Sequence, residues 1–503
     1  MKIGKAYLVG AGPGDEGLLT LKGKKCIEEA EVIIYDRLAN PRLLEMANKN
    51  CEMIYVGKAS SDHTMTQEDI NLLIAKKALE GKVVTRLKGG DPYVFGRGGE
   101  EAQVLVEHGV EFEVVPGITS GIAGLCYAGI PITHRDYASS LHLITGHLKE
   151  EEEDLDWNAL AKLKGTLVFY MGVKNLDSIS KNLIREGMDK ETPVAIINWA
   201  THPRQKVVTG TLENIYQIAI DAKIKPPSLI AVGKVVSLRD ELNFFEKKPL
   251  FGKKIVVTRA RAQASKLTDI LKEKGAEVIE CPSIEISKIE PNEELNEAIK
   301  NIVDYTHIIF TSQNAVDIFF EELYKEYDAR SLKAAQIVSI GPATTKQLKK
   351  YGIKADMQAK EFVAEGVIES LEGKLNKDSK ILLPRAKEAR EKLALELAKI
   401  CEVKEIHIYE TIKGINDEEI LNELENQKID YITFTSSSTV KNFYSMLNQA
   451  VLKNIEEAKI ISIGPITSKT VEDMNKSVYK EADEYTIDGV VKAIESIVIE
   501  GMN

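Results

Sequence analysis

Cysteine is scarce in this chain and follows no motif. The cysteines are odd in number, scattered over the whole length and never in C-x-x-C spacing: Cys26, Cys51, Cys126, Cys281 and Cys401. This pattern excludes a disulfide framework and a cysteine-based zinc site, and it favours buried thiols in a reducing compartment. His142 and His147 lack i, i+4 spacing and have no cysteine nearby, so no metal site is expected.

Long apolar runs and an excess of positive charge are missing as well. No apolar stretch reaches the roughly 18 residues that a membrane span needs. The run Ala6–Ala11 is too short for a signal peptide and is soon followed by Asp15. The net charge of −11 argues against nucleic-acid binding, although it allows a local basic cleft for a small acid. We therefore expect a cytoplasmic protein without membrane or nucleic-acid partners.

Aromatic residues make up only 6% of the chain, with 44% hydrophobic and 28% charged residues, which is typical of a globular protein. The length of 503 residues corresponds to roughly three domains. A charge run containing Pro249 and Gly252 lies at 246–254, and an apolar strand, Ile255–Thr258, follows it directly. We therefore predict two units, 1–246 and 250–503.

Glycine is concentrated in short segments of the first half: Val9–Asp15, Arg86–Pro92, Gly96–Glu101 and Val115–Gly121. Glycine adopts backbone angles that other residues avoid and lets a ligand approach the main chain closely. Several such turns in one unit predict loops that surround a small molecule.

The first of these segments also matches a dinucleotide-binding motif. Gly12–Gly17 has G-x-G-x-x-G spacing between a predicted strand, Ala6–Val9, and a predicted helix, Leu18–Ala30. The next predicted strand, Val32–Tyr35, leads into Asp36, about where a ribose-binding acid would lie. However, Asp15 and Glu16 lie inside the loop and would repel a pyrophosphate at the helix N-terminus. An NAD-linked oxidoreductase is therefore the less favoured alternative.

The second half contains an internal repeat. Four segments recur about 124 residues later, which predicts duplication of one α/β lobe: Ile308–Val316 as Ile432–Val440, Ser339–Thr344 as Ser462–Thr467, Ala364–Val367 as Ile487–Val490, and Val257–Ala260 as Leu383–Ala386. Short apolar strands alternate with amphipathic helices such as Ala264–Lys274, which predicts an α/β fold with mostly parallel sheets.

Hydroxyl and glycine residues follow the predicted strands of both repeats, at Thr311-Ser312 and Thr435-Ser436, and at Gly341-Pro342 and Gly464-Pro465. Parallel sheets bind ligands at the carboxyl ends of their strands, so these residues predict an anion-binding cleft between two lobes. The alternative is that Ser and Thr only cap helices there.

Residues 3–246 resemble S-adenosylmethionine-dependent uroporphyrinogen-III C-methyltransferase. The resemblance lies in Val9–Gly23, Tyr35–Leu38, Val56–Lys58, Gln67–Ile70, Arg86–Glu101, Val115–Ser120, Tyr127–Arg135, Thr145–His147, Pro227–Gly233 and Leu238–Asp240. The second half resembles uroporphyrinogen-III synthase in its duplicated lobe, its Gly-Pro-x-Thr motifs, Leu383–Ala386 and Tyr409–Thr411.

These resemblances imply a bifunctional enzyme. The synthase half would cyclise hydroxymethylbilane to uroporphyrinogen III with inversion of the last ring. The other half, with a two-lobed methylase fold, would add two methyl groups to give precorrin-2. A homodimer through the methyltransferase half is expected from the family. Two alternatives are a non-catalytic two-lobed binding module in the second half and methylation of a later corrin by the first.

The resemblance to the methyltransferase also implies site residues. Around S-adenosylmethionine it places Pro13, Gly89, Gly90, Asp91, Val94, Thr119, Ser120, Met171 and Ala200. Met171 would pack on the adenine or, alternatively, only fill the core. Asp36 would take a proton or stabilise a cation, and Lys58 would donate a proton. The alternatives are that Asp36 caps the helix starting near Pro41 and that Lys58 anchors a carboxylate.

Basic residues in the motif loops are candidates to bind the substrate carboxylates, because guanidinium groups bind carboxylates bidentately. They are Arg86, Lys88, Arg97, His134 and Arg135, and some of them would alternatively pair with Glu100 or Glu101. In the synthase half, Tyr409 is the candidate to assist loss of water, or alternatively a half-buried strand tyrosine. The expected carboxylate contacts there are Thr435, Ser436, Gly464 and Thr467.

Overall fold

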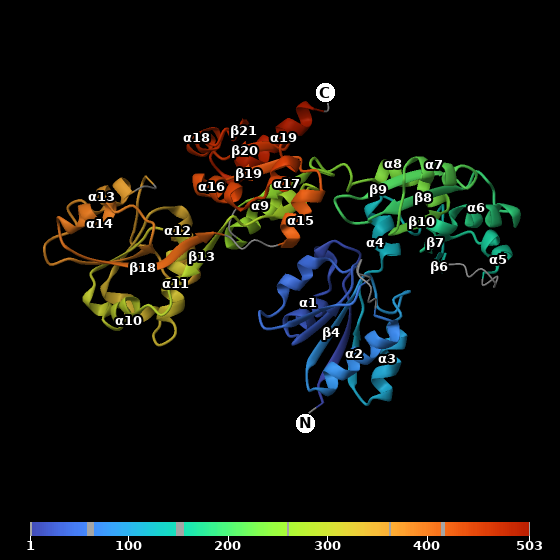
Figure 1. The fold of residues 1–503 in the computed structure, drawn as a ribbon, viewed down its shortest axis with the longest axis horizontal. Helices are drawn as coiled ribbons and strands as arrows, with labels where there is room; N and C mark the ends of the chain where they lie inside the picture. Colours follow the sequence, from blue (N-terminus) through green and yellow to red (C-terminus); the bar gives the residue numbers. More distant parts are fainter. Residues whose placement is uncertain are drawn as a thin grey trace. The chain divides into compact units, whose positions relative to one another are not determined.

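A computed structural model describes residues 3–57, 65–146, 155–258, 261–361, 364–413 and 418–501 (Figure 1). The chain forms two compact units, and each is described by itself. Unit 1 comprises 1–253 with 271–277 and 498–503; unit 2 comprises 254–270 and 278–497. Within the described ranges, no helix has the length and apolar character needed to cross a membrane.

The first lobe of unit 1 is a parallel five-stranded sheet in the order β3-β2-β4-β1-β5. Its strands are β1 (Lys5–Gly10), β2 (Val32–Tyr35), β3 (Glu52–Tyr55), β4 (Val83–Lys88) and β5 (Glu111–Val115). Successive strand residues point to opposite faces. Leu8 and Ile34 therefore pack under α2 (Gln67–Leu79) and α3 (Gly98–Glu107). Val9 and Ile33 pack under α1 (Leu21–Glu28) on the other face.

The second lobe of unit 1 is a mixed sheet in the order β6-β7-β10-β8-β9. Its strands are β6 (Leu141–Thr145), β7 (Thr166–Tyr170), β8 (Pro193–Asn198), β9 (Lys206–Thr211) and β10 (Ser228–Val232). Its helices are α4 (Ser120–Tyr127), α5 (Trp157–Lys162), α6 (Leu176–Arg185), α7 (Ile215–Asp221) and α8 (Arg239–Leu242). One face packs on α5, α6 and α7, and the other on α4.

Unit 2 contains two similar α/β sheets. The first has the order β12-β11-β19-β20-β21 and contains β11 (Lys254–Val257), β12 (Glu277–Glu280), β19 (Tyr431–Phe434), β20 (Lys459–Ser462) and β21 (Val478–Glu481). The second has the order β13-β18-β17-β14-β15-β16. It contains β13 (Ile284–Lys288), β14 (His307–Phe310), β15 (Gln336–Ser339), β16 (Met357–Gln358), β17 (Lys380–Ala386) and β18 (Glu402–Lys413).

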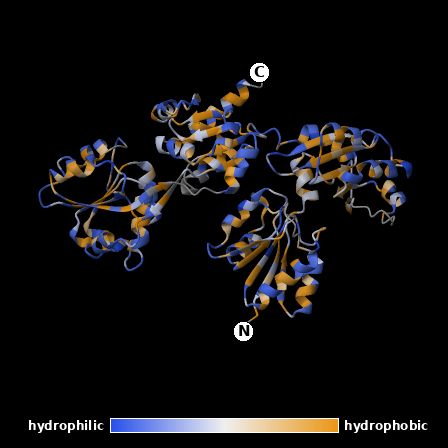
Figure 2. Ribbon diagram, in the orientation of Figure 1, coloured by the Kyte–Doolittle hydropathy of each residue, from blue (hydrophilic) through white to orange (hydrophobic). Residues whose placement is uncertain are grey.

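Helices connect the strands of both sheets, and apolar residues concentrate on the strands they cover (Figure 2). The helices of the β11 lobe are α9 (Arg261–Glu273), α15 (Glu418–Asn426), α16 (Ser437–Met446), α17 (Gln449–Asn454), α18 (Pro465–Asp473) and α19 (Ile487–Glu500). Those of the β14 lobe are α10 (Glu293–Lys300), α11 (Gln313–Leu323), α12 (Pro342–Lys350), α13 (Ala364–Leu371) and α14 (Lys392–Ala398). The predicted α/β class with two similar lobes is confirmed.

The sequence repeat does not coincide with a lobe. The first repeat supplies β11 and β12 to one sheet and β14, β15 and β16 to the other. The second repeat supplies β17 and β18 beside β14, and then β19, β20 and β21 beside β11. Our interpretation that each repeat is one lobe was therefore wrong, because strand pairing joins half of each repeat to half of the other.

Candidate active site

The glycine-rich loops of unit 1 meet at the carboxyl ends of β1, β4 and β5. Gly12 and Gly90 exchange backbone hydrogen bonds of 3.2 and 2.7 Å. A Cβ atom on Gly117 would lie 2.3 Å from the carbonyl oxygen of Gly90, and one on Gly10 would lie 2.5 Å from the Cα atom of Gly117. Only glycine fits these crossings. The three loops therefore form a closely packed cradle of backbone at the end of the sheet where ligands bind.

Asp91 ties two loops of this cradle together. Its Oδ2 atom accepts the N–H of Gly117 at 3.0 Å, and its Oδ1 atom accepts the N–H of Tyr93 at 2.8 Å. Each carboxylate oxygen retains a second lone pair, so hydrogen bonding to a ligand hydroxyl or amine is chemically compatible with this role.

Tyr170, at the end of β7, holds the start of α4. Its hydroxyl lies 2.8 Å from Oγ1 of Thr119 and accepts the N–H of Gly121 at 2.7 Å. Thr119 is buried and Ser120 begins α4. Sequence reasoning missed Tyr170, although its place beside Met171 at the end of a strand was the available signal.

The second lobe adds residues in an unusual backbone conformation. Met171 has φ of 56° and is 56% exposed, so the alternative that it fills the core was wrong. Trp199 and Thr201, with φ of 47° and 69°, flank the buried Ala200. Such left-handed conformations of non-glycine residues concentrate at functional sites.

The remaining predicted cofactor residues lie in or beside the cradle loops. Pro13 and Gly89 belong to the loops after β1 and β4, and Val94 packs against the second-lobe core. A Cβ atom on Gly89 would be 2.7 Å from Cβ of Leu38.

Asp15 begins a short helical turn in the first loop. Its Oδ1 atom accepts the N–H of Gly17 at 2.8 Å, and its Oδ2 atom accepts the Tyr127 hydroxyl at 2.8 Å. The Asp15 carboxylate thus occupies the helix N-terminus where a dinucleotide pyrophosphate would bind. The geometry agrees with the argument against NAD.

A cluster of charged side chains lies beneath the cradle. Arg86 donates to Glu101 at 3.1 Å, to Asp36 at 3.0 Å and to the carbonyls of Ile34 and Leu87. Lys88 donates to the same Glu101 oxygen at 2.7 Å. Arg86, Lys88 and Glu101 are buried, and burial is the main reason that the pKa of Lys88 is lowered.

For the basic residues of the motif loops, the alternatives were binding of substrate carboxylates and pairing with acidic side chains of the protein. Arg86 and Lys88 are buried and donate hydrogen bonds to groups of the protein, which disfavours direct contact with a substrate carboxylate. Arg97 is more exposed but forms an ion pair of 2.6 Å with Glu100. His134 is partly exposed and Arg135 is exposed, on the segment that precedes β6.

Asp36 directly follows β2 and is 27% exposed. Its Oδ1 atom accepts the N–H of Leu38 at 3.1 Å. The alternative that Asp36 caps the helix starting near Pro41 was wrong, because Asn40 accepts the N–H of Arg42 there. Lys58 lies outside the described residues.

In unit 2, Tyr409 is buried on β18 rather than half-buried. Its hydroxyl lies 2.9 Å from Oγ of Ser312, which caps α11 by accepting the N–H of Ala315. Burial raises the pKa of the Tyr409 phenol, although hydrogen bonds from Ser312 and Asn314 oppose the rise. The phenol is therefore held in its neutral form at the start of α11. Sequence reasoning had not linked Ser312 to Tyr409.

The predicted carboxylate contacts lie in the other lobe of unit 2. Ser436 caps α16 by accepting the N–H of Thr439, so the capping alternative applies to it. Gly464 precedes Pro465 at the start of α18, and Thr467 is buried. Thr435 is partly exposed at the end of β19. Both helices begin at the carboxyl ends of parallel strands, where their N–H groups favour anions.

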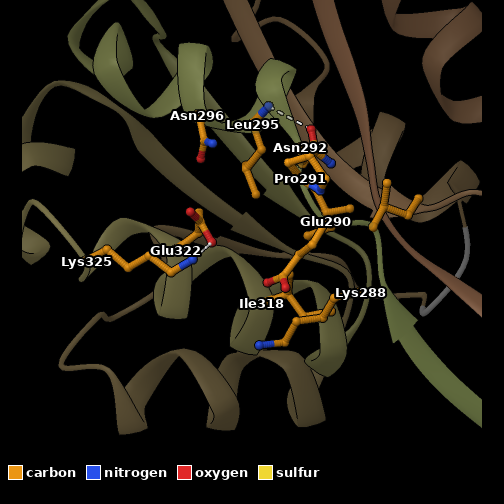
Figure 3. Close-up of a pocket in the computed structure, with 11 residues that line it drawn as sticks. Lys288, Glu290, Pro291, Asn292, Leu295, Asn296, Ile318, Glu322 and Lys325 are labelled. Atoms are coloured by element: carbon orange, nitrogen blue, oxygen red, sulfur yellow. Dashed lines mark hydrogen bonds and ion pairs between the residues drawn. The ribbon is translucent and has the colours of Figure 1, made fainter.

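A hollow of about 280 Å³ lies beside α10 and α11 (Figure 3). Two interactions join its lining residues: Asn292 accepts the N–H of Leu295, and Lys325 pairs with Glu322. None of the predicted site residues lines it.

Comparison with known proteins matches each half to a different family model. Residues 5–216 match the model of tetrapyrrole (corrin/porphyrin) methylases, and residues 265–492 match that of the uroporphyrinogen-III synthase HemD. The porphyrin biosynthesis protein HemD of Ruminiclostridium josui is 39% identical over 502 residues, which is 99% of each chain. The chain belongs to this family of methylase–synthase fusions. The resemblance stated for both halves is thereby confirmed.

Two further similar proteins carry the name of the methyltransferase. A uroporphyrinogen-III C-methyltransferase of Bacillus subtilis is 48% identical over 355 residues, covering 70% of this chain and 72% of its own length. A crystal structure of uroporphyrin-III C-methyl transferase from Thermus thermophilus complexed with S-adenyl homocysteine is 40% identical, covering 47% of this chain and all of its own, with a TM-score of 0.40.

Proposed function

We propose that this fusion protein catalyses two consecutive steps of tetrapyrrole biosynthesis. The synthase half closes hydroxymethylbilane with loss of water and inversion of the last ring. The methyltransferase half forms two carbon–methyl bonds on the resulting uroporphyrinogen III, giving precorrin-2. The observation that carries the proposal is that one chain joins a synthase to a methylase, and the product of the synthase is the substrate of the methylase.

We propose that the backbone cradle binds S-adenosylmethionine. Bound there, this cofactor supplies an electrophilic methyl group on a sulfonium. We propose that the loops at Pro13, Gly89–Asp91 and Thr119–Ser120, with Val94, Met171 and Ala200, bind and orient it. Displacement at a methyl group needs alignment more than acid–base help, and good alignment can contribute roughly 7–11 kcal/mol. A site built from fixed loops with glycine-only crossings suits that demand.

Asp36 is the proposed group that accepts the proton lost after methyl transfer or stabilises the cationic ring system. It is the partly exposed carboxylate at the end of β2, and Arg86 and the Leu38 N–H fix its two oxygens. Lys58 is the proposed proton donor. Arg97, His134 and Arg135 are the proposed contacts for substrate carboxylates, because they are more accessible than Arg86 and Lys88.

In the synthase half, Tyr409 is the proposed donor to the departing hydroxyl group. Burial keeps the phenol protonated, and Ser312 orients it. Thr435, Ser436, Gly464 and Thr467 are the proposed carboxylate contacts at the starts of α16 and α18. We further propose domain limits of 1–246 and 250–503, a homodimer through the methyltransferase half and a cytoplasmic location. The five cysteines, all free thiols, support the last of these.

The test is isomer and mass analysis after incubation of the full chain with hydroxymethylbilane and methyl-labelled S-adenosylmethionine without oxygen. A type-III macrocycle with two labelled methyl groups is expected. An unmethylated type-III product would refute the methyltransferase assignment. A methylated type-I product would show that ring closure was spontaneous and that the second half only binds. An Asp36→Asn variant should still bind cofactor but lose about 100-fold or more in methyl transfer if Asp36 is the base.

A further inference from the structure

Four charged side chains of the first lobe form one hydrogen-bonded path that ends at Asp36. Arg86 and Lys88 lie two residues apart on β4, so both side chains point to the same face of the sheet. Oε1 of Glu101, on α3, accepts Nε of Arg86 at 3.1 Å and Nζ of Lys88 at 2.7 Å. Arg86 then donates from Nη2 to Oδ2 of Asp36 at 3.0 Å.

Exposure increases from Glu101 through Arg86 to Asp36. The Glu101 side chain is 0% exposed, that of Arg86 3% and that of Asp36 27%. The path is thus anchored in the interior, and only Asp36 reaches the surface where a substrate can bind. Two further carbonyl contacts, from Ile34 and Leu87, leave the Arg86 guanidinium little freedom to turn.

Stability alone does not account for this cluster. Oε2 of Glu101 is buried and accepts no hydrogen bond from any residue in the described part of the chain. Buried ion clusters with an unmet acceptor contribute little to the free energy of unfolding, because desolvation of the charges offsets their attraction. What the cluster does provide is a single orientation for Asp36.

We propose that Glu101 is a positioning residue for methyl transfer. Glu101 fixes Arg86, and Arg86 fixes Oδ2 of Asp36 while the Leu38 N–H fixes Oδ1. A group that takes a proton must lie within hydrogen-bond reach of the atom that loses it, so a small turn of the carboxylate slows the step. This inference rests on the proposed role of Asp36. It also assigns Arg86 and Lys88 to the support of Asp36 rather than to substrate binding.

The primary test is Glu101→Gln in the full chain, which keeps the shape of the side chain and removes its charge. The matched control is Glu107→Gln, an exposed glutamate on the same helix. The measurements are kcat and KM for methyl transfer to uroporphyrinogen III, and the Kd of S-adenosylhomocysteine. We expect kcat to fall about tenfold in Glu101→Gln, the order expected when a charge-assisted hydrogen bond is lost. KM and Kd should stay within about twofold, and Glu107→Gln should match the wild type.

Combination with Asp36→Asn distinguishes positioning from general damage. If Glu101 acts through Asp36, Glu101→Gln slows the Asp36→Asn background no further. The same further tenfold loss in that background, or a rise in Kd that follows loss of folded protein, would overturn the proposal. If Asp36→Asn alone keeps full kcat, the proposed role of Asp36 is what fails. Should Glu101→Gln not fold, Arg86→Lys tests the same path, because one ammonium cannot replace a guanidinium that bridges both carboxylates; unchanged kcat in that variant would also refute the proposal.

Discussion

The hydroxyl of Tyr170 lies 2.8 Å from Oγ1 of Thr119 and so joins the end of β7 to the start of α4. The same hydroxyl accepts the N–H of Gly121 at 2.7 Å, and a Cβ atom on Gly121 would lie only 2.3 Å from it. One phenol from the second lobe therefore sets the position of the loop at Thr119–Ser120, which is a proposed part of the cofactor site.

Tyr170→Phe should weaken cofactor binding. The substitution leaves the buried Thr119 hydroxyl and the Gly121 N–H without their partner, which should lower the free energy of unfolding by about 1–3 kcal/mol. We expect a several-fold rise in the Kd of S-adenosylhomocysteine, measured by calorimetry. Tyr216→Phe, at an exposed tyrosine of α7, is the control and should behave as wild type. An unchanged Kd in Tyr170→Phe would show that the loop does not depend on this contact.

Gly117→Ala should disrupt the loop crossing. The added methyl group would lie 2.3 Å from the Gly90 carbonyl oxygen, so backbone must move, with an expected destabilisation of about 3 kcal/mol. Unfolding can be followed by tryptophan fluorescence, because both tryptophans, Trp157 and Trp199, lie in unit 1. Gly99→Ala is the control: nothing lies within 4 Å of its Cβ position, and alanine should be neutral or slightly stabilising in α3. Equal midpoints for the two variants would contradict the packing argument.

Acid should destabilise unit 1 through His202. Burial, and then the charge of Arg204, lower the pKa of His202 to about 4, whereas an unfolded histidine titrates near 6.5. Between these values the unfolded state binds the proton and the folded state does not, so stability falls as the pH falls from about 6.5 to 4. The loss should approach roughly 3 kcal/mol below that window and be absent above pH 7.

The check for His202 is the unfolding midpoint of unit 1 as a function of pH in wild type, His202→Gln and His108→Gln. His108 is exposed on the surface of the first lobe and serves as the matched control. His202→Gln should flatten the decline between pH 6.5 and 4, and His108→Gln should not. Parallel curves for wild type and His202→Gln would disprove the assignment.

Tyr409→Phe should slow ring closure without preventing binding of the linear substrate. Burial raises the pKa of Tyr409, so the phenol stays protonated throughout the neutral and mildly alkaline range. In the wild type we expect no loss of the ring-closure rate from deprotonation of this group between pH 7 and 9. In Tyr409→Phe the ring-closure rate should fall about 100-fold if the phenol acts as the acid. The measurements are the rate of ring closure and the ratio of type-III to type-I product. Ser312→Ala should give a smaller loss, because it removes only the group that orients the phenol.

Several features of the fold and site were predictable because they depend on local chemistry. Strand Val32–Tyr35 was predicted with the bounds that it has in the structure, and the Asp15 carboxylate lies at the loop position on which the argument against a dinucleotide rested. The strand-end position of Asp36 also followed from apolar patterning, and Tyr409 lies on a strand, β18, as predicted. The hydrogen-bond partners of Asp36 and Tyr409 could not be predicted in this way, because Arg86 lies 50 residues from Asp36 along the chain and Ser312 lies 97 residues from Tyr409. Sequence reasoning therefore left open whether the basic residues of the motif loops bind substrate or pair with acids.

The sequence by itself determined the two halves, the α/β class, the duplicated segments and the glycine-rich loops, since periodicity, turn chemistry and repeats depend only on the order of residues along the chain. Only the tertiary structure decided how those pieces combine. Strand pairing mixed the two repeats into each lobe of unit 2, because hydrogen bonding between strands is indifferent to which repeat supplies them. Burial placed Arg86 and Lys88 against Glu101 and left Asp36 at the surface. A charge inside a protein needs a partner, and the fold alone chooses which one lies within reach.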